Sequence, residues 1–509
     1  MEVTERRILG HSPGLFVLFA TEMWERFSFY GMKALLIYYL TKYHLFSDDA
    51  GNILVGSYAA MVYAFPVIGG YVADKYLGFR KAVLFGGILL VLGHLGMAFE
   101  GSAATRTADG GVVQDTFALQ VFYLSMALII VGVGFLKGNI SSIVGTLYDQ
   151  GDDRRDSGFT IFYMGINLGS FLATLLCGWL GENYGWNYGF GAAGIGMIFG
   201  LLVFVWGQKY FKGKAEPPNV QYLQEKVMGF INKETLIYIL AIAFVFVSWG
   251  VVQNHTIVEI ILIGASIIAL VRIVYYAINQ ATKIERDRLL VLTVLIIFSV
   301  IFWALFEQAY TSMNLFADRV IDRTVGSNEL PASWFLSLNA LFIIIFAPVF
   351  AWIWVKLDKI KANPNPIIKF ALGILFAGAG FGFLVLGCKA VGDAGKVAPI
   401  FLVLAYAFHS WGELCLSPVG LSSVTRLSPT KIVGFMMGVW FLATAGAEYI
   451  AGLLATIASI DTSGPSEMTD AVFAYENLFT ILFYMGLIFG GILLVLAPIL
   501  KRFLHEKES

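Results

Sequence analysis

The chain contains fourteen apolar stretches, each about as long as a helix that crosses a lipid bilayer. A hydrocarbon core of about 30 Å needs about 20 helical residues, because each residue rises about 1.5 Å along the helix axis. Polar, charged or Gly- and Pro-containing breaks separate the stretches, so we predict one membrane-spanning helix for each. Their approximate limits are 14–41, 51–74, 82–100, 117–147, 158–180, 188–210, 235–253, 256–279, 288–317, 332–356, 366–388, 397–424, 432–458 and 474–500.

The composition supports this interpretation. Of the 509 residues, 58% are apolar and only 14% are charged, against roughly 25% charged residues in soluble domains. Lipid is therefore the expected solvent, which argues against a water-soluble enzyme. The formal net charge of −1 leaves no basic excess for binding nucleic acid. The first stretch is long and carries charges, so we interpret it as a retained span and not as a signal peptide.

The loops indicate how the spans are organised. Lys and Arg concentrate in the N-terminal segment and in alternate loops, so both termini are predicted to be cytoplasmic. A polar segment separates spans six and seven, and spans seven and eight are close enough to form a hairpin. We therefore predict an all-α membrane protein with an N-terminal six-helix bundle (1–210), a cytoplasmic linker (211–234), an inserted transmembrane hairpin (235–280) and a C-terminal six-helix bundle (281–509).

Ten charged residues fall inside the predicted spans. A charge near the centre of a spanning helix costs about 2.5–3.5 kcal/mol on the insertion scale, so most of the ten must pair, face water or lie near the interface. They are Glu22, Glu25, Arg26, Lys33, Lys137, Glu259, Arg272, Glu307, Glu413 and Glu448.

The first span concentrates polar groups on one helix face. Spacings of three and four residues place five side chains on this stripe: Glu22, Glu25, Arg26, Tyr30 and Lys33. Buried carboxylates beside cations can change protonation when a partner moves, which is the requirement for coupling proton flow to a conformational change. Glu22, Glu25 and Glu307 are therefore candidate proton carriers. The alternative is a purely structural ladder of ion pairs.

Lys137, Glu307 and Glu413 bring opposite charges from other spans. A cavity with a base on one side and an acid on the other suits a dipolar ligand with a carboxylate and an ammonium group. Lys137 and Glu413 could instead only bridge helices. Further candidate lining residues, each equally suited to packing, are Tyr30, Tyr63, Asn167, Trp303, Asn339, Trp440 and Phe441.

Three other charged residues and one histidine receive weaker assignments. His409 lies one helical turn before Glu413 and could tune it, but a lone histidine is more often a packing residue. Glu259, Arg272 and Glu448 belong to no recognisable constellation, so we assign them structural roles.

Together with their neighbours, these residues form motifs that resemble those of a known family, the proton-dependent oligopeptide transporters of the major facilitator superfamily. The resemblance rests on four spaced motifs and extends through essentially the whole chain. They are Glu22-x-x-Glu25-Arg26-Phe27-x-Phe29-Tyr30-Gly31, Gly69-Gly70-x-x-x-Asp74 with Gly78, Phe159-x-x-Phe162-Tyr163-x-x-x-Asn167-x-Gly169-Ser170, and Gly412-Glu413-Leu414 with Ser417-Pro418. Bacterial members with an inserted hairpin are similar in having fourteen spans.

The resemblance implies roles for individual residues. Glu22, Glu25 and Arg26 would serve proton coupling, with Arg26 and Lys137 near the carboxylate of a peptide. Glu413, helped by Asn167 and Asn339, would hold its amino terminus. The implied gate pairs are Lys33 with Glu307 on the outside and Lys137 with Glu413 on the inside.

Four departures from the family pattern limit this transfer. Phe29 replaces a tyrosine. Lys33 stands where an arginine is frequent, so its pair with Glu307 would be a point-charge pair and not a bidentate one. Gly138 stands where a proline is usual. The histidine that animal members carry in the second helix has no counterpart here, so proton binding cannot depend on it.

We therefore expect an importer of di- and tripeptides driven by protons through alternating access in the inner membrane, without other cofactors or an obligate protein partner. A carrier of nitrate, another anion or a drug on the same fold is the alternative. An intramembrane enzyme or sensor is disfavoured, because the sequence has no HExxH motif, catalytic triad or phosphate loop. Neither disulfides nor a zinc site is expected, because the three cysteines lie in apolar runs without CxxC spacing: Cys177, Cys388 and Cys415.

Overall fold

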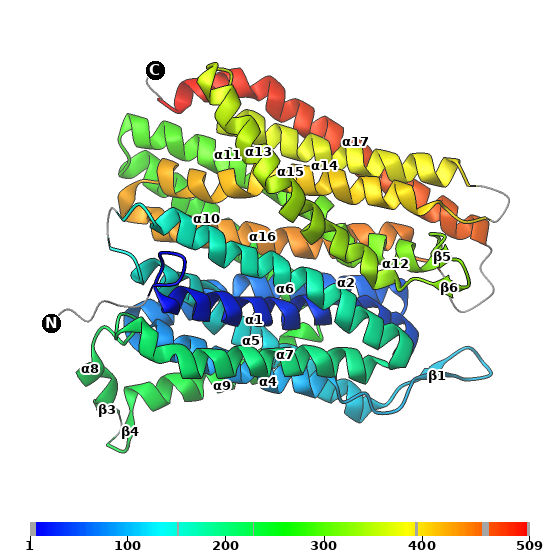
Figure 1. Cartoon of the computed structure of the whole chain (residues 1–509), viewed down its shortest axis with the longest axis horizontal. Helices are drawn as coiled ribbons and strands as arrows, with labels where there is room; N and C mark the ends of the chain where they lie inside the picture. The colour runs from blue at the N-terminus through cyan, green and yellow to red at the C-terminus, as the bar shows by residue number, and fades with distance from the viewer. Residues whose placement is uncertain (1–6, 150–151, 228, 392–394, 461–467, 506–509) are drawn as a thin grey trace. The chain divides into compact units, whose positions relative to one another are not determined.

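The computed structural model describes residues 7–149, 152–227, 229–391, 395–460 and 468–505. Helices form most of it (Figure 1): α1 (Pro13–Tyr38), α2 (Asp48–Ala64), α3 (Pro66–Val72), α4 (Phe79–Met97), α5 (Thr116–Thr146), α6 (Arg155–Tyr184), α7 (Trp186–Gly207), α8 (Val220–Gln224), α9 (Lys233–Val252), α10 (His255–Asn279), α11 (Lys283–Phe306), α12 (Ser312–Arg319), α13 (Ser337–Lys359), α14 (Pro366–Lys389), α15 (Pro399–Leu427), α16 (Val433–Ala455) and α17 (Met468–Phe503).

Short elements connect the long helices. Three antiparallel two-stranded ribbons pair β1 (Thr105–Arg106) with β2 (Val112–Val113), β3 (Lys226–Val227) with β4 (Ile231–Asn232), and β5 (Thr324–Val325) with β6 (Asn328–Glu329). Single turns of π- or 3₁₀-helix are η1 (Tyr39–Tyr43), η2 (Ala73–Leu77), η3 (Gln208–Phe211), η4 (Glu307–Tyr310), η5 (Ala332–Leu336), η6 (Thr430–Ile432) and η7 (Thr456–Ala458).

The predicted membrane spans are confirmed as helices. Within the described residues, thirteen helices are long and apolar enough to cross a membrane. Helix α1, with 26 residues, is long enough to be the fourteenth, but it carries the four charges predicted for it: Glu22, Glu25, Arg26 and Lys33. In the absence of water, a helix satisfies its own backbone hydrogen bonds, so long apolar stretches must become helices in lipid.

The chain forms two compact units. One comprises Met1–Leu45 and Met61–Asn254, and the other comprises Phe46–Ala60 and His255–Ser509. The chain therefore passes between the units three times: between Leu45 and Phe46, inside α2, and between α9 and α10. The boundaries of the two bundles, the linker and the hairpin stay a prediction.

In the first unit, α7 lies beside both α1 and α4 (Figure 1), while α1 also packs against α6 and α5 packs against α4 and α9. Helix α3 approaches α5 closely at Gly69, where a methyl group would overlap the carbonyl oxygen of Gly134. Gly69 belongs to the second sequence motif, so its small size is required by helix packing.

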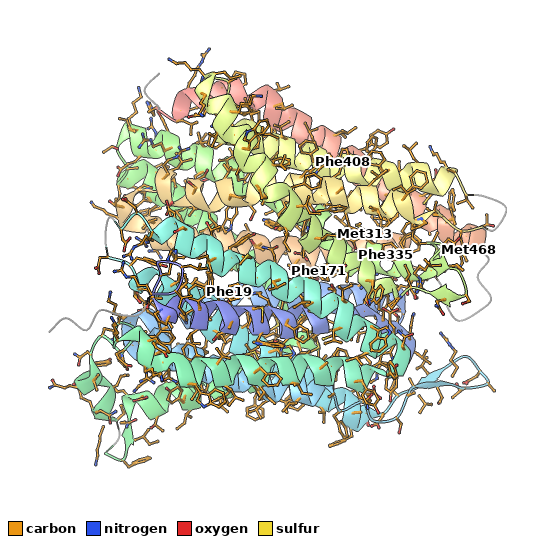
Figure 2. The ribbon with its side chains drawn as sticks, in the orientation of Figure 1. Phe19, Phe171, Met313, Phe335, Phe408 and Met468 are labelled. Atoms are coloured by element: carbon orange, nitrogen blue, oxygen red, sulfur yellow. The ribbon has the colours of Figure 1, made fainter. Side chains whose placement is uncertain are left out.

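In the second unit, α14 packs against α15 and α17, α11 packs against α16, and α13 packs against α15. Aromatic rings fill part of this unit. The ring of Phe408, labelled in Figure 2, has its centre 4.8 Å from that of Trp411 and 4.9 Å from that of Phe383. Helix α10, the second helix of the predicted hairpin, packs against α16 of the same unit.

Gly452 of α16 gives a testable measure of packing inside the second unit. A Cβ atom there would lie 2.6 Å from the backbone oxygen of Asn52 in α2 and 3.0 Å from the Cα of Gly56. Gly452→Ala is therefore expected to destabilise the protein by about 1–3 kcal/mol through overpacking. The measurement is the thermal unfolding midpoint of the purified full-length chain in detergent.

The matched control is Gly446→Ala in the same helix, because a Cβ atom at Gly446 would meet nothing within 4 Å. This control should be neutral or slightly stabilising, since alanine has a better helix propensity than glycine by about 1 kcal/mol. Equal midpoints for the two variants would contradict the close approach of α2 and α16.

The ninth span differs from the continuous helix predicted at 288–317. Helix α11 ends at Phe306, a 3₁₀ turn begins at Glu307, and α12 starts at Ser312. The Nε2 atom of Gln308 donates hydrogen bonds to the carbonyl oxygens of Ala304 (3.2 Å) and Ala451 (2.9 Å). This buried side chain satisfies backbone groups at the break, so the helix is interrupted where Glu307 lies.

Candidate functional site

The predicted stripe on α1 forms a buried cluster around Arg26. Its Nε atom lies 2.8 Å from Oε1 of Glu22 and 2.9 Å from Oε2 of Glu25. The side chains of Arg26, Glu22 and Glu25 are 4%, 2% and 0% exposed. The helical spacing that the sequence showed therefore brings two carboxylates to one guanidinium, away from water.

Two carboxylate oxygens of this cluster can still accept a hydrogen bond. Within the described structure, Oε2 of Glu22 and Oε1 of Glu25 are buried and have no hydrogen-bond partner. Because a buried polar atom without a partner costs free energy, each of these oxygens favours receiving a donor. A proton or an N–H group of a ligand would supply it.

A second group of side chains gathers around Tyr63 of α2. The Nζ atom of Lys137 in α5 lies 3.7 Å from the centre of the Tyr63 ring, and Nζ of Lys33 lies 6.0 Å from it. Lys137 also lies 5.9 Å from the ring of Phe29 and is close enough to Glu25 to interact electrostatically. Aromatic faces attract ammonium groups, so Tyr63 positions both lysines.

Two cations lie beside the carboxylates of α1: Arg26 and Lys137. A proton on Glu22 or Glu25 leaves these cations in excess, and such an excess suits an anionic group such as a carboxylate.

Two further predicted residues of the first unit contact their own helices. Tyr30 lies edge-on to Phe29 with ring centres 5.3 Å apart. The Nδ2 atom of Asn167 donates a hydrogen bond to the carbonyl oxygen of Tyr163, 3.2 Å away on α6. The carbonyl oxygen of the Asn167 side chain is then the end of the amide left to accept from a ligand.

In the second unit, Asn339 of α13 and Glu413 of α15 are brought together as predicted. Nδ2 of Asn339 donates to Oε2 of Glu413 at 3.2 Å and to Oγ of Ser410 at 3.0 Å. Ser410 in turn donates to the carbonyl oxygen of Tyr406. Sequence reasoning missed Ser410, although its position three residues before Glu413 places both on one face of the helix.

The other candidate residues of the second unit make packing contacts. Nε2 of His409 lies 3.1 Å from the carbonyl oxygen of Ala377, and its ring packs 4.7 Å from Phe381. Trp303 stacks edge-on with its neighbours in α11, Trp440 is 5% exposed, and Phe441 is half-buried. These contacts match the packing alternative that the sequence left open for each of them.

The charged residues to which we assigned structural roles lie where α10 packs against α16. Glu259 accepts a hydrogen bond from the hydroxyl of Tyr449 at 3.3 Å, and the guanidinium of Arg272 lies 4.5 Å from the ring centre of Phe435. Glu448 is 3% exposed on α16. These pairs anchor a helix of the predicted hairpin.

The gate pairs take one residue from each unit. Lys33 and Lys137 belong to the first, and Glu307 and Glu413 to the second, so both pairs stay predictions.

Among the described residues, no group of three or more His, Cys, Asp and Glu side chains could hold a metal ion.

Within the described residues, fourteen helices are long enough to cross a membrane, and charged side chains are buried among them. This combination is typical of a multi-pass membrane transporter. A model of the POT family matches residues 80–469, and the chain belongs to this family, the proton-dependent oligopeptide transporters. This is a family of transporters and not a class of enzymes.

Known proteins resemble the chain over nearly its full length. The peptide transporter YePEPT of Yersinia enterocolitica is 39% identical over 474 residues, which cover 88% of each protein. A di-/tripeptide transporter of Lactococcus lactis is 34% identical over 98% of each protein. The crystal structure of a mutant peptide transporter POT in complex with alafosfalin matches with a TM-score of 0.80 and 38% identity, covering 99% of this chain and 98% of that one.

Proposed function

We propose that this protein is a symporter that imports di- and tripeptides together with protons by alternating access. The observation that carries the proposal is the buried cluster in which Glu22 and Glu25 share Arg26 while two of their oxygens have no hydrogen-bond partner. Support comes from the relatives, which are named as peptide or di-/tripeptide transporters. The coupling ion is the proton, with no other cofactor and no catalysed reaction.

The two clusters suit the two ends of a peptide. The peptide carboxylate would lie at Arg26 and Lys137, the two cations beside Glu22 and Glu25. The peptide ammonium group would lie at Glu413, whose Oε2 is oriented by Asn339. The side-chain oxygen of Asn167 would accept a hydrogen bond from the same ammonium group. Recognition of both ends would leave the peptide side chains loosely specified.

Proton binding would be linked to the gates. A proton on Glu22 or Glu25 neutralises one of the two carboxylates beside Arg26. A proton on Glu307 would weaken its outer pair with Lys33. The inner gate would pair Lys137 with Glu413. We place the protein in the cytoplasmic (inner) membrane with both termini in the cytoplasm, because Lys and Arg concentrate in the corresponding loops.

Transport of nitrate, another anion or a drug is the alternative function. Arg26, Lys33 and Lys137 could form an anion site without an amine partner. Glu413 distinguishes the alternatives, because a carboxylate that accepts a hydrogen bond from Asn339 suits an amine and repels an anion.

The test is uptake of labelled dialanine into proteoliposomes containing the full-length protein. With the interior alkaline, we expect uptake severalfold above that of liposomes without a gradient, together with inhibition by unlabelled tripeptides. The control is a proton ionophore, which should reduce uptake to the level without a gradient. Uptake that is independent of the gradient would contradict proton coupling, and nitrate uptake in place of dialanine would favour the alternative.

A further inference from the structure

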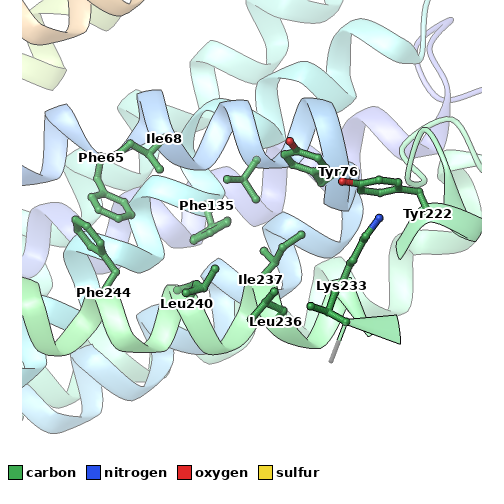
Figure 3. Close-up of a pocket in the computed structure, with 13 residues that line it drawn as sticks. Phe65, Ile68, Tyr76, Phe135, Tyr222, Lys233, Leu236, Ile237, Leu240 and Phe244 are labelled. Atoms are coloured by element: carbon green, nitrogen blue, oxygen red, sulfur yellow. The ribbon is translucent and has the colours of Figure 1, made fainter. Parts of the chain in front are cut away.

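An apolar groove of about 450 Å³ lies on the first unit, and none of its lining residues belongs to the charged groups around Arg26 and Tyr63. Helix α3 and η2 form one wall, α9 forms the other, and Phe135 of α5 lies between them. Figure 3 shows Phe65 and Phe244 at one end of the groove and Tyr76, Tyr222 and Lys233 at the other. The volume falls in the range of ligand pockets, about 300–1,000 Å³.

The groove follows one face of α9. Its lining residues on this helix recur at helical spacing: Lys233, Leu236, Ile237, Leu240, Ala241 and Phe244. The eleven steps from Lys233 to Phe244 correspond to about 16 Å at about 1.5 Å per residue. This length is close to half of the hydrocarbon thickness of about 30 Å, which is the depth of one leaflet.

The groove is open along its side. Leu240 is 59% exposed and Phe244 is 37% exposed, although both line the groove. Since α9 is a membrane-spanning helix, an occupant enters from the bilayer. The walls are apolar between the two ends, so they offer no hydrogen bonds to the amides of a peptide.

The two ends of the groove differ in chemistry. At one end, the rings of Phe65 and Phe244 meet with centres 4.7 Å apart. At the other end, Tyr76 and Tyr222 stack with centres 5.9 Å apart, and Nζ of Lys233 lies 3.5 Å from the Tyr222 ring. Aromatic rings and lysines of this kind are typical of the boundary between hydrocarbon and head groups.

At the polar end of the groove, the lysine ammonium groups can still bind an anionic group. Lys75 of η2 lies 5.4 Å from the Tyr76 ring and donates a hydrogen bond to the hydroxyl of Tyr71 at 2.9 Å. Lys233 forms an ion pair of 2.5 Å with Glu225, whose side chain is 59% exposed. Among the described residues, Lys75 therefore contacts phenol groups and no carboxylate.

We propose that the groove binds one acyl chain of a membrane glycerophospholipid, with the lipid phosphate at Lys75 and Lys233. The chain would lie along Leu236, Leu240 and Phe244 and end at Phe65. An apolar path one leaflet long, open to the bilayer and closed by lysines and phenols at the interface, matches this occupant at both ends. The inference does not depend on the transported substrate.

The experiment uses photoactivatable phosphatidylglycerol with a diazirine midway along one acyl chain, in liposomes containing the full-length protein. Labelled peptides are identified by mass spectrometry. We expect labelling concentrated on α3, α5 and α9 residues that line the groove. Labelling spread evenly over all helices would overturn the proposal.

Variants of α9 test the groove itself. Ala241→Trp fills it, and Leu240→Trp occupies it from an exposed position, so the second variant remains informative if the first does not fold. Each should lower labelling of the groove about tenfold, the change that corresponds to a loss of about 1.4 kcal/mol of binding. The control is Ile239→Trp, since Ile239 is 47% exposed and does not line the groove. Unchanged labelling in both groove variants would overturn the proposal.

A phosphate-free probe tests the polar end. Photoactivatable diacylglycerol with the same acyl chains should label the groove severalfold less than phosphatidylglycerol. Lys233→Gln should reduce labelling by phosphatidylglycerol, whereas Lys233→Arg should retain it. Equal labelling by the two probes would refute the phosphate contact at Lys75 and Lys233.

Discussion

Glu22→Gln is expected to abolish proton-driven uptake of dialanine while leaving exchange of peptide across the membrane largely intact. Glutamine retains an oxygen that can accept the hydrogen bond from Nε of Arg26, which the carboxylate accepts at 2.8 Å. It cannot take up or release a proton, so the gradient has no means of acting through this position. The measurement is uptake in proteoliposomes with an alkaline interior, which should fall to the rate without a gradient, beside counterflow in liposomes preloaded with peptide.

The control for this experiment is Glu259→Gln in α10. Glu259 is also an intramembrane carboxylate, but its hydrogen-bond partner is the Tyr449 hydroxyl at 3.3 Å and not a cation. The Glu259→Gln variant should take up dialanine at the same gradient-driven rate as the unsubstituted protein. If Glu22→Gln also lost counterflow, Glu22 would be a ligand of the peptide and not a coupling residue. If gradient-driven uptake persisted in full, the coupling role would be wrong.

Asp48→Ala is expected to lower the free energy of unfolding by about 3–5 kcal/mol, the cost of leaving one partner of a buried ion pair alone. Asp48 is 1% exposed and pairs with Arg319 through two bonds, Oδ2 to Nη1 at 2.6 Å and Oδ1 to Nη2 at 2.7 Å. Oδ2 also accepts from the backbone N–H of Ile460 at 3.0 Å. The thermal unfolding midpoint of the purified protein in detergent measures the loss.

Asp49→Ala is the matched control, because the neighbouring Asp49 is exposed. Its effect should stay near zero, as for most surface substitutions. The double variant Asp48→Ala, Arg319→Met should recover part of the lost stability, because it removes the uncompensated charge as well. Identical midpoints for Asp48→Ala and Asp49→Ala would contradict a stabilising role for this pair.

The spans were predictable because lipid leaves a long apolar segment few choices. The limits predicted at 117–147 and 366–388 agree with Thr116–Thr146 and Pro366–Lys389 to within one residue at each end. The break at Glu307 was not predictable from apolar length. It depends on Gln308, whose Nε2 atom reaches the carbonyl oxygen of a residue 143 positions away.

The site was predictable where neighbours in space are also neighbours along one helix. Glu22, Glu25 and Arg26 are within four residues of one another, so helical spacing alone predicted their cluster. The role of Asn339 beside Glu413 came from the family resemblance, since 74 residues separate them. Neither route indicated Ser410, because a serine inside an apolar helix is more often bonded to its own backbone.

The sequence by itself determined that this chain spans a membrane and that Glu22, Glu25 and Arg26 share one helix face. Local rules suffice for these conclusions, because the hydrophobic length and the helical period are properties of adjacent residues. The peptide transporters were indicated by the resemblance of four motifs. Only the tertiary structure decided which distant groups meet. Asp48 and Arg319 are 271 residues apart, and the groove beside α9 exists only where that helix packs on α5. Such pairings depend on the packing of whole helices, which no short segment encodes.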